Sequence, residues 1–178
     1  METAVVVRVP EAEPAIGAHR REHTLDAADG MPAHMTILYP FADSAVLVAG
    51  MVRELRETLA DVPAFRFAID RLARFTEPPP SVLYGAPEPA APFVRLTERV
   101  RDRFGFLPYG GQHTTVIPHL TIAIGLADAE LDRIQADVER WLPIECSVDA
   151  CEVWEHAADG WRMMHPIPLG PSLGLASR

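Results

Sequence analysis

Two short stretches of this chain pair a histidine with a threonine two positions later. The first contains His34 and Thr36, and the second contains His119 and Thr121; each lies inside an apolar run and follows a nearby proline. Alternate side chains of a β-strand share a face, so each histidine and its threonine would point the same way while the residues between them enter a core. One such motif would mean little, but two predict a single site built from matched halves.

Two imidazoles on opposite sides of one small group can perform general acid and base catalysis. An unperturbed histidine titrates at about pH 6.5, so near neutrality one ring can be neutral while its partner is protonated. The threonine hydroxyls could donate hydrogen bonds to an anion held between the rings. A phosphodiester suits this arrangement, because its non-bridging oxygens accept those bonds while the rings serve the attacking and leaving oxygens. The scheme requires no metal and no cofactor.

The paired motifs resemble those of the two-histidine (2H) phosphoesterase superfamily, and most closely its bacterial 2′-5′ RNA ligase and RNA 2′,3′-cyclic phosphodiesterase branch. The resemblance covers roughly residues 3–168 and includes Pro40-Phe41 after the first motif. It implies an α+β, bilobal fold with a pseudo-twofold axis, in which two mostly antiparallel sheets surround a central cleft and helices lie outside. It also implies the roles of four residues, with His34 and His119 as the catalytic pair and Thr36 and Thr121 as phosphate-binding residues.

The composition favours hydrolysis of a small diester over the joining of long RNA. The net charge is −9, which disfavours binding of extended nucleic acid through phosphate neutralisation. All 16 basic residues are arginine, which excludes chemistry that needs a lysine nucleophile. We therefore expect a metal-independent phosphoesterase acting on a 2′,3′-cyclic phosphate or a similar nucleotide or RNA-end diester. The alternatives are 2′-5′ RNA ligase activity and a non-catalytic nucleotide-binding protein.

The roles of the two histidines are not distinguished by their motifs. We assign His119 to activating the attacking water and His34 to protonating the leaving oxygen, and the near symmetry of the motifs leaves the reverse open. Phe41 lies beyond the first histidine strand and is considered as a residue that stacks on a nucleobase. Tyr39 is expected in the core because its odd offset from His34 places it on the opposite strand face, and Trp161 is expected in the core or the rim of a lobe.

A metal site is the main chemical alternative. His19 and His23 have the i, i+4 spacing that can chelate a metal on one face of a helix. No glutamate lies between them in the metalloprotease arrangement, and the intervening Arg20 and Arg21 add positive charge. We therefore expect no metal site.

The order of predicted elements repeats, which indicates an old duplication. Residues 3–75 read as strand, helix, histidine strand, helix and long strand, and residues 81–155 repeat that order before one further strand. We expect one bilobal domain over residues 1–178, with halves at 3–75 and 81–168 and a flexible tail at 170–178. The long strand of the second half is predicted over 144–154, a helix of the first half over 45–60, and a loop over 26–32.

The remaining features place the protein among ordinary globular chains. No export signal or membrane-length apolar run is visible, so we expect a cytoplasmic protein with no membrane partner and no extended nucleic-acid groove. Cys146 and Cys151 are expected to be reduced packing residues. The oligomeric state is not indicated.

Overall fold

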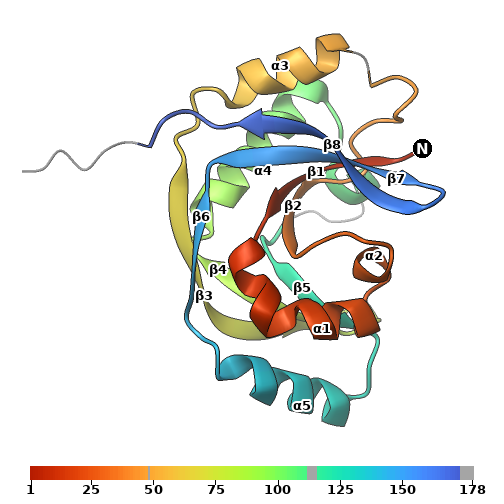
Figure 1. The fold of residues 1–178 in the computed structure, drawn as a ribbon, viewed down its shortest axis with the longest axis vertical. Coiled ribbons are helices and arrows are strands. Elements are labelled where there is room, and N and C mark those ends of the chain that lie inside the picture. Colours follow the sequence, from red (N-terminus) through yellow and green to blue (C-terminus); the bar gives the residue numbers. More distant parts are fainter. Residues whose placement is uncertain (48, 112–115, 173–178) are drawn as a thin grey trace, which may run out of the picture.

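The protein contains helices and two antiparallel sheets, which confirms the expected α+β class. Each sheet has four strands, and one sheet is curled. The computed structural model describes residues 1–47, 49–111 and 116–172 (Figure 1). The strand orders are β2-β1-β7-β8 and β5-β4-β3-β6. The strands are β1 Thr3–Arg8, β2 His34–Leu38, β3 Phe65–Phe75, β4 Val82–Glu88, β5 Leu120–Ile124, β6 Ile144–Val148, β7 Ala150–Ala157 and β8 Gly160–Pro168.

Helices cover the outer sides of both sheets. Helices α3 and α4 lie at one end of the molecule and α1, α2 and α5 at the other (Figure 1). The helices are α1 Glu13–His23, α2 Leu25–Ala28, α3 Ala49–Leu59, α4 Ala91–Phe104 and α5 Asp128–Glu139, with 3-10 turns at Pro10–Ala12 and Pro108–Gly111. Of the helices described, none combines the length and apolar character needed to cross a bilayer.

The two halves of the chain exchange elements. Strand β3 ends the first half, yet it lies between β4 and β6, which come from the second half. Strand β7 returns from the second half to pair with β1. The helices cross in the same way, because α1 packs against β5 while α4 packs against β2. The predicted element order is present, but each four-stranded sheet contains strands from both halves.

Strand β1 is one of the two inner strands of its sheet. Its β-branched run is buried on both faces, because a separate apolar cluster covers each face. Val5 and Val7 enter the main core, while Ala4 and Val6 face a smaller cluster that contains Met31 and Trp154.

Four predicted boundaries need correction. The strand expected over 144–154 is two strands, and β6 and β7 belong to different sheets. Residues expected in a loop form α2, since the Thr24 hydroxyl accepts a hydrogen bond from the Ala27 amide at its start. The helix expected from residue 45 begins at Ala49. Gly170, expected in the flexible tail, pairs with Pro63; residues 173–178 of that tail lie outside the described part.

Both cysteines are free and buried, as the sequence predicts. Burial raises the pKa of the Cys146 thiol and of the Cys151 thiol to about 12. The thiols are therefore protonated packing groups at neutral pH.

Candidate active site

The two histidine strands meet although they belong to different sheets. Strand β2 is at one edge of its sheet and strand β5 is at one edge of the other sheet, and the two strands lie against one another. The structure thereby brings four predicted residues to one cavity of about 890 Å³, which is lined by His34, Thr36, His119 and Thr121 among others. On β2 the alternation is as predicted, with both motif residues half-buried and Met35 and Ile37 in the core.

The two imidazoles are oriented in the same way. Nδ1 of His34 lies 2.9 Å from the carbonyl oxygen of Pro32, and Nδ1 of His119 lies 2.7 Å from that of Ile117. A carbonyl oxygen can only accept, so Nδ1 carries the hydrogen in each ring. Proton exchange with a substrate therefore falls on Nε2 of both residues.

His34 is held neutral by its surroundings. Its side chain is 11% exposed, and its Nε2 lies 3.9 Å from Oδ2 of Asp26. Burial, followed by the positive charge of Arg20, lowers the pKa of His34 to about 4, against an opposing effect of the Asp26 carboxylate. At neutral pH the ring has a lone pair on Nε2 and can accept a proton.

His119 lies in a different environment. The ring of Phe75 on β3 meets it edge-on with centroids 5.2 Å apart, and the ring of Tyr84 on β4 lies 5.6 Å away. Those two aromatic rings stack on one another at 4.2 Å. Two aromatic rings thus lie beside His119, whereas the charged groups of Arg20 and Asp26 lie near His34.

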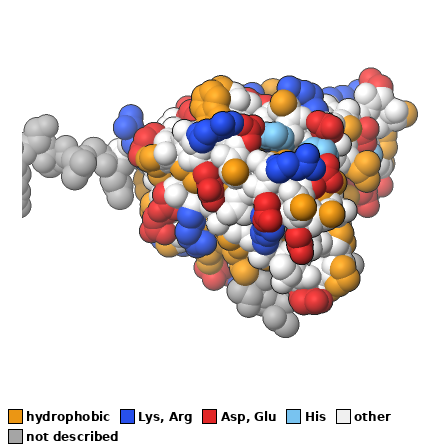
Figure 2. Space-filling model, turned by 90° about the horizontal axis from the view of Figure 1, so that it is seen from below, with side chains coloured by type: hydrophobic (Ala, Val, Ile, Leu, Met, Phe, Trp, Pro, Cys, Tyr) orange, Lys and Arg blue, Asp and Glu red, His pale blue; other side chains and the backbone are white. Residues whose placement is uncertain are grey.

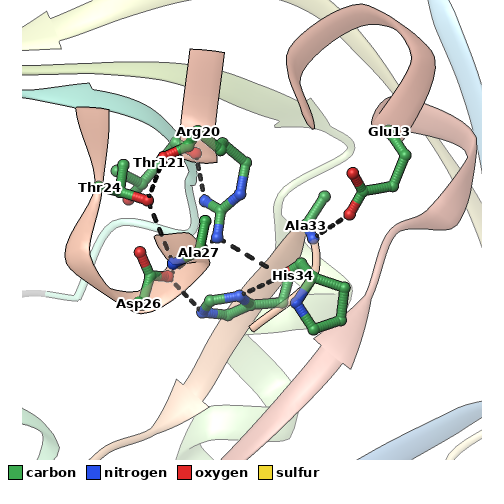
Figure 3. A network of polar contacts seen from close by, with 9 residues as sticks. Glu13, Arg20, Thr24, Asp26, Ala27, Ala33, His34 and Thr121 are labelled. Carbon is green, nitrogen blue, oxygen red and sulfur yellow. Dashed lines mark hydrogen bonds and ion pairs between the residues drawn. The ribbon is translucent and has the colours of Figure 1, made fainter. Parts of the chain in front are cut away.

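Arg20 is the functional candidate that the motif analysis missed. It is 1% exposed, and its guanidinium lies between the two histidine strands (Figure 3). Nη1 donates to the carbonyl oxygen of Thr121 at 2.5 Å, while Nη2 donates to Asp26 at 2.9 Å and to the carbonyl oxygen of Pro32 at 3.5 Å. Burial favours the neutral form of Asp26, but Arg20 and a hydrogen bond from Thr24 outweigh it and lower the pKa of that carboxyl.

One sequence signal could have identified Arg20. Ala12, Ile16 and Arg20 are spaced four apart and are all buried, so the arginine continues the apolar stripe of α1. Arg21, next in the sequence, is exposed.

Aromatic side chains line the cavity beyond the histidines. Trp161 on β8 stacks on His156 with centroids 4.8 Å apart, and Tyr39 meets it edge-on at 6.2 Å. Tyr39 and Trp161 both line the cavity, and Tyr39 does so because it lies beyond the end of β2, where strand alternation no longer fixes its direction. The expectation that Tyr39 serves only the core was therefore incomplete.

Phe41 does not lie in this cavity. It is 2% exposed and packs edge-on against Phe104 and Phe106, at centroid distances of 5.1 and 5.7 Å. The structure makes it a core residue, and the aromatic surface beside the histidines comes from Trp161 and Tyr39 instead.

The rim of the cavity is acidic. Glu22, Asp26 and Asp29 are among its lining residues. His19 and His23 have separate partners, because His19 lies 2.9 Å from Asp137 while His23 lies near Glu22 and lines the cavity. Within the described ranges, no group of three or more His, Cys, Asp or Glu side chains is placed to hold a metal ion.

Sequence comparison finds a family and two relatives. The family model described as the 2′-5′ RNA ligase superfamily matches residues 9–160. A protein of Bacillus licheniformis and one of Geobacillus kaustophilus, both named as candidate phosphoesterases, are 31% and 29% identical to this chain over 100 residues. Each match covers 56% of this chain, and it spans 57% and 56% of the respective relative, a little over half its length.

Solved structures share the fold over nearly the whole chain. The protein TT0787 of Thermus thermophilus matches with a TM-score of 0.68 at 17% identity, covering 96% of this chain and 99% of that one. Escherichia coli LigT in complex with 3′-AMP matches with a TM-score of 0.60 at 15% identity, covering 97% and 98%. At sequence identities this low, the similarity to these structures shows a shared fold and no more.

Proposed function

This chain belongs to the 2′-5′ RNA ligase superfamily, and on that premise we propose that it hydrolyses a 2′,3′-cyclic phosphate or a similarly small nucleotide or RNA-end phosphodiester. The observation that carries the proposal is the matched pair of imidazoles. His34 and His119 line one cavity, and each has Nδ1 bonded to the carbonyl two residues upstream, so both rings exchange protons through Nε2.

The proposed reaction uses the two rings in different roles. His34 takes a proton from water as the water oxygen forms a bond to phosphorus. The bond from phosphorus to one ribose oxygen breaks, and His119 donates a proton to that leaving oxygen. The product is a ribose phosphomonoester. Thr36 and Thr121 donate hydrogen bonds to the non-bridging oxygens, on which negative charge grows in the transition state.

This assignment reverses the one expected from the sequence. His34 is proposed as the base because burial and the nearby Arg20 charge keep its Nε2 unprotonated at neutral pH. His119 is then the acid, since the leaving oxygen needs a proton from a second group.

The cavity suits a small substrate with few charges. The carboxylates of Glu22 and Asp29 at its rim would repel a ligand that carries many phosphates. The face seen in Figure 2 mixes acidic and basic side chains without a continuous basic strip. The nucleoside part would lie near Trp161 and Tyr39, whose rings can contact a base. The nucleotide held by LigT, 3′-AMP, is of the kind that such hydrolysis releases.

The decisive experiment is hydrolysis of 2′,3′-cyclic AMP by the purified protein, with and without EDTA. His34→Ala and His119→Ala should each lower kcat by roughly 10²- to 10⁴-fold, the usual contribution of a general acid or base. His165→Ala is the matched control, because His165 lies on β8 and is not among the residues lining the cavity. Circular dichroism checks that each variant is folded.

Each other outcome has a distinct meaning. Near-normal turnover by either folded alanine variant contradicts the two-histidine mechanism. Loss of activity in EDTA indicates a metal enzyme, and binding without turnover indicates a nucleotide sensor. Joining of RNA ends by the same preparation would indicate the ligase alternative.

A further inference from the structure

Arg20 is a buried charge that the proposed reaction does not use directly. Arginine is rarely buried completely unless its charge is paired and its donors are satisfied. Here the side chain is 1% exposed and is surrounded by acceptors from three separate segments (Figure 3).

The acceptors belong to the two histidine motifs and to the short helix beside them. Nη2 reaches the carbonyl oxygen of Pro32, the same oxygen to which His34 Nδ1 donates. Nη1 reaches the carbonyl oxygen of Thr121, which belongs to the second motif. The third acceptor is Asp26 on α2. A planar guanidinium can donate to several acceptors at once in a fixed geometry, which an ammonium group cannot reproduce.

We propose that Arg20 is a positioning residue for this site, which ties the two histidine strands together and, through its charge, favours the neutral form of the His34 imidazole. The catalytic part of this inference rests on the proposed function. The structural part does not rest on it, since it concerns the relative placement of β2 and β5 and the charge state of His34.

The charges that face His34 come from three elements. Arg20 on α1 disfavours a proton on the ring, Asp26 on α2 favours one, and His119 ahead of β5 disfavours one. Asp26 is itself bonded to Arg20, so its charge is partly neutralised. The effect of Arg20 on the pKa of His34 is larger than that of Asp26, and the effect of burial is larger than either.

Two substitutions separate the charge of Arg20 from its shape. Arg20→Lys keeps the positive charge but loses the fork that reaches two carbonyl oxygens. Arg20→Gln removes the charge and keeps some hydrogen-bonding capacity. Arg21→Gln is the matched control, since it removes the same charge from the neighbouring, exposed position.

The first readout is the titration of His34, which is monitored through the NMR signal of its ring Cε1–H. In Arg20→Gln the pKa of His34 should rise above about 4 but stay below 6.5, because the ring is still buried, and the rising limb of kcat/KM should move to higher pH with it. In Arg20→Lys the titration should stay near that of the unaltered protein, while kcat falls roughly 10- to 100-fold through misplacement of the strands. Arg21→Gln should change neither.

The proposal is overturned if folded Arg20→Gln shows an unchanged His34 titration. If that variant does not fold, Asp26→Asn replaces it, and the opposite effect is expected because the carboxylate favours the proton: the titration of His34 should move below about pH 4. An unchanged or raised value in Asp26→Asn also overturns the proposal. If the protein does not hydrolyse cyclic nucleotides, the NMR titration still tests Arg20, so the two failures are distinguishable.

Discussion

At the scale of single residues, a backbone carbonyl two residues upstream orients each of the two histidines. The carbonyl of Pro32 accepts a hydrogen bond from Nδ1 of His34, and that of Ile117 accepts one from Nδ1 of His119. Nε2 is therefore the nitrogen left to exchange protons with a substrate in both rings. The rings thus have equal orientation and unequal neighbours. The neighbours of His34 lower its pKa to about 4, and this is the physical basis for proposing it as the base.

The free energy of unfolding should depend on pH through His34. Its pKa is about 4 in the folded protein and about 6.5 when unfolded, so the fold disfavours the protonated ring. The stabilisation is full above about pH 6.5 and is lost as the pH falls toward 4, which corresponds to about 3 kcal/mol.

Urea denaturation at pH 7.5 and pH 4 checks this expectation. His34→Gln cannot titrate, so the stability advantage of the unaltered protein over this variant should shrink by about that amount between the two pH values. A constant difference between the two proteins would contradict a depressed pKa.

The two histidine motifs, whose residues line one cavity, were visible in the sequence, but the partners of the charge beside them were not. His34 and Thr36 stand out because strand alternation places both on one face with apolar residues between them. The spacing from Ile16 distinguishes Arg20 from Arg21 and indicates burial, but it names no partner. The packing of α1 against β5 brings Arg20 to the carbonyl oxygen of Thr121. The same limit explains Phe41, since the contact with Phe104 that buries it comes from a distant helix.

At the scale of elements, the β7–β8 hairpin gives the cavity its aromatic side. Trp161→Ala should raise KM for 2′,3′-cyclic AMP roughly 5- to 150-fold, the equivalent of about 1–3 kcal/mol of base stacking. KM for ribose 2′,3′-cyclic phosphate, which lacks the base, should change little.

Trp141→Ala is the control for this variant. Trp141 is 53% exposed and is not among the residues lining the cavity, so neither KM should change. An equal loss on both substrates in Trp161→Ala would assign the tryptophan to the shape of the hairpin rather than to base contact.

The type and order of elements follow from periodicity, whereas their partners do not. Alternation continues from Ile144 into residue 154, so the sequence reads as one strand although β6 and β7 enter different sheets. Periodicity reports which face of a strand is buried and contains no information on its neighbour. Helix α2 is too short to show a period, and its signal is the single cap at Thr24.

At the scale of the whole molecule, the exchange of strands makes the halves dependent on each other. Fragments 1–78 and 79–178 should each lack a cooperative thermal transition, because β3 and β7 have lost sheet partners in the other fragment. Mixing the fragments should restore the dispersed NMR spectrum of the full chain.

The control for the fragment experiment is a full-length chain with a protease site placed in the turn at 76–81. The full chain, cut there after folding, should keep its spectrum, since the contacts across the cut are already made. Independent folding of either fragment would show that the predicted duplication units remain autonomous.

The position of β7 also bears on how the protein is made. Synthesis runs from the N-terminus, so β1 and β2 leave the ribosome early, while the second neighbour of β1 lies at residues 150–157. Until then the first sheet is a two-stranded ribbon, which is marginally stable in water. Prematurely terminated chains should therefore be removed by cellular proteases instead of accumulating as partial enzymes.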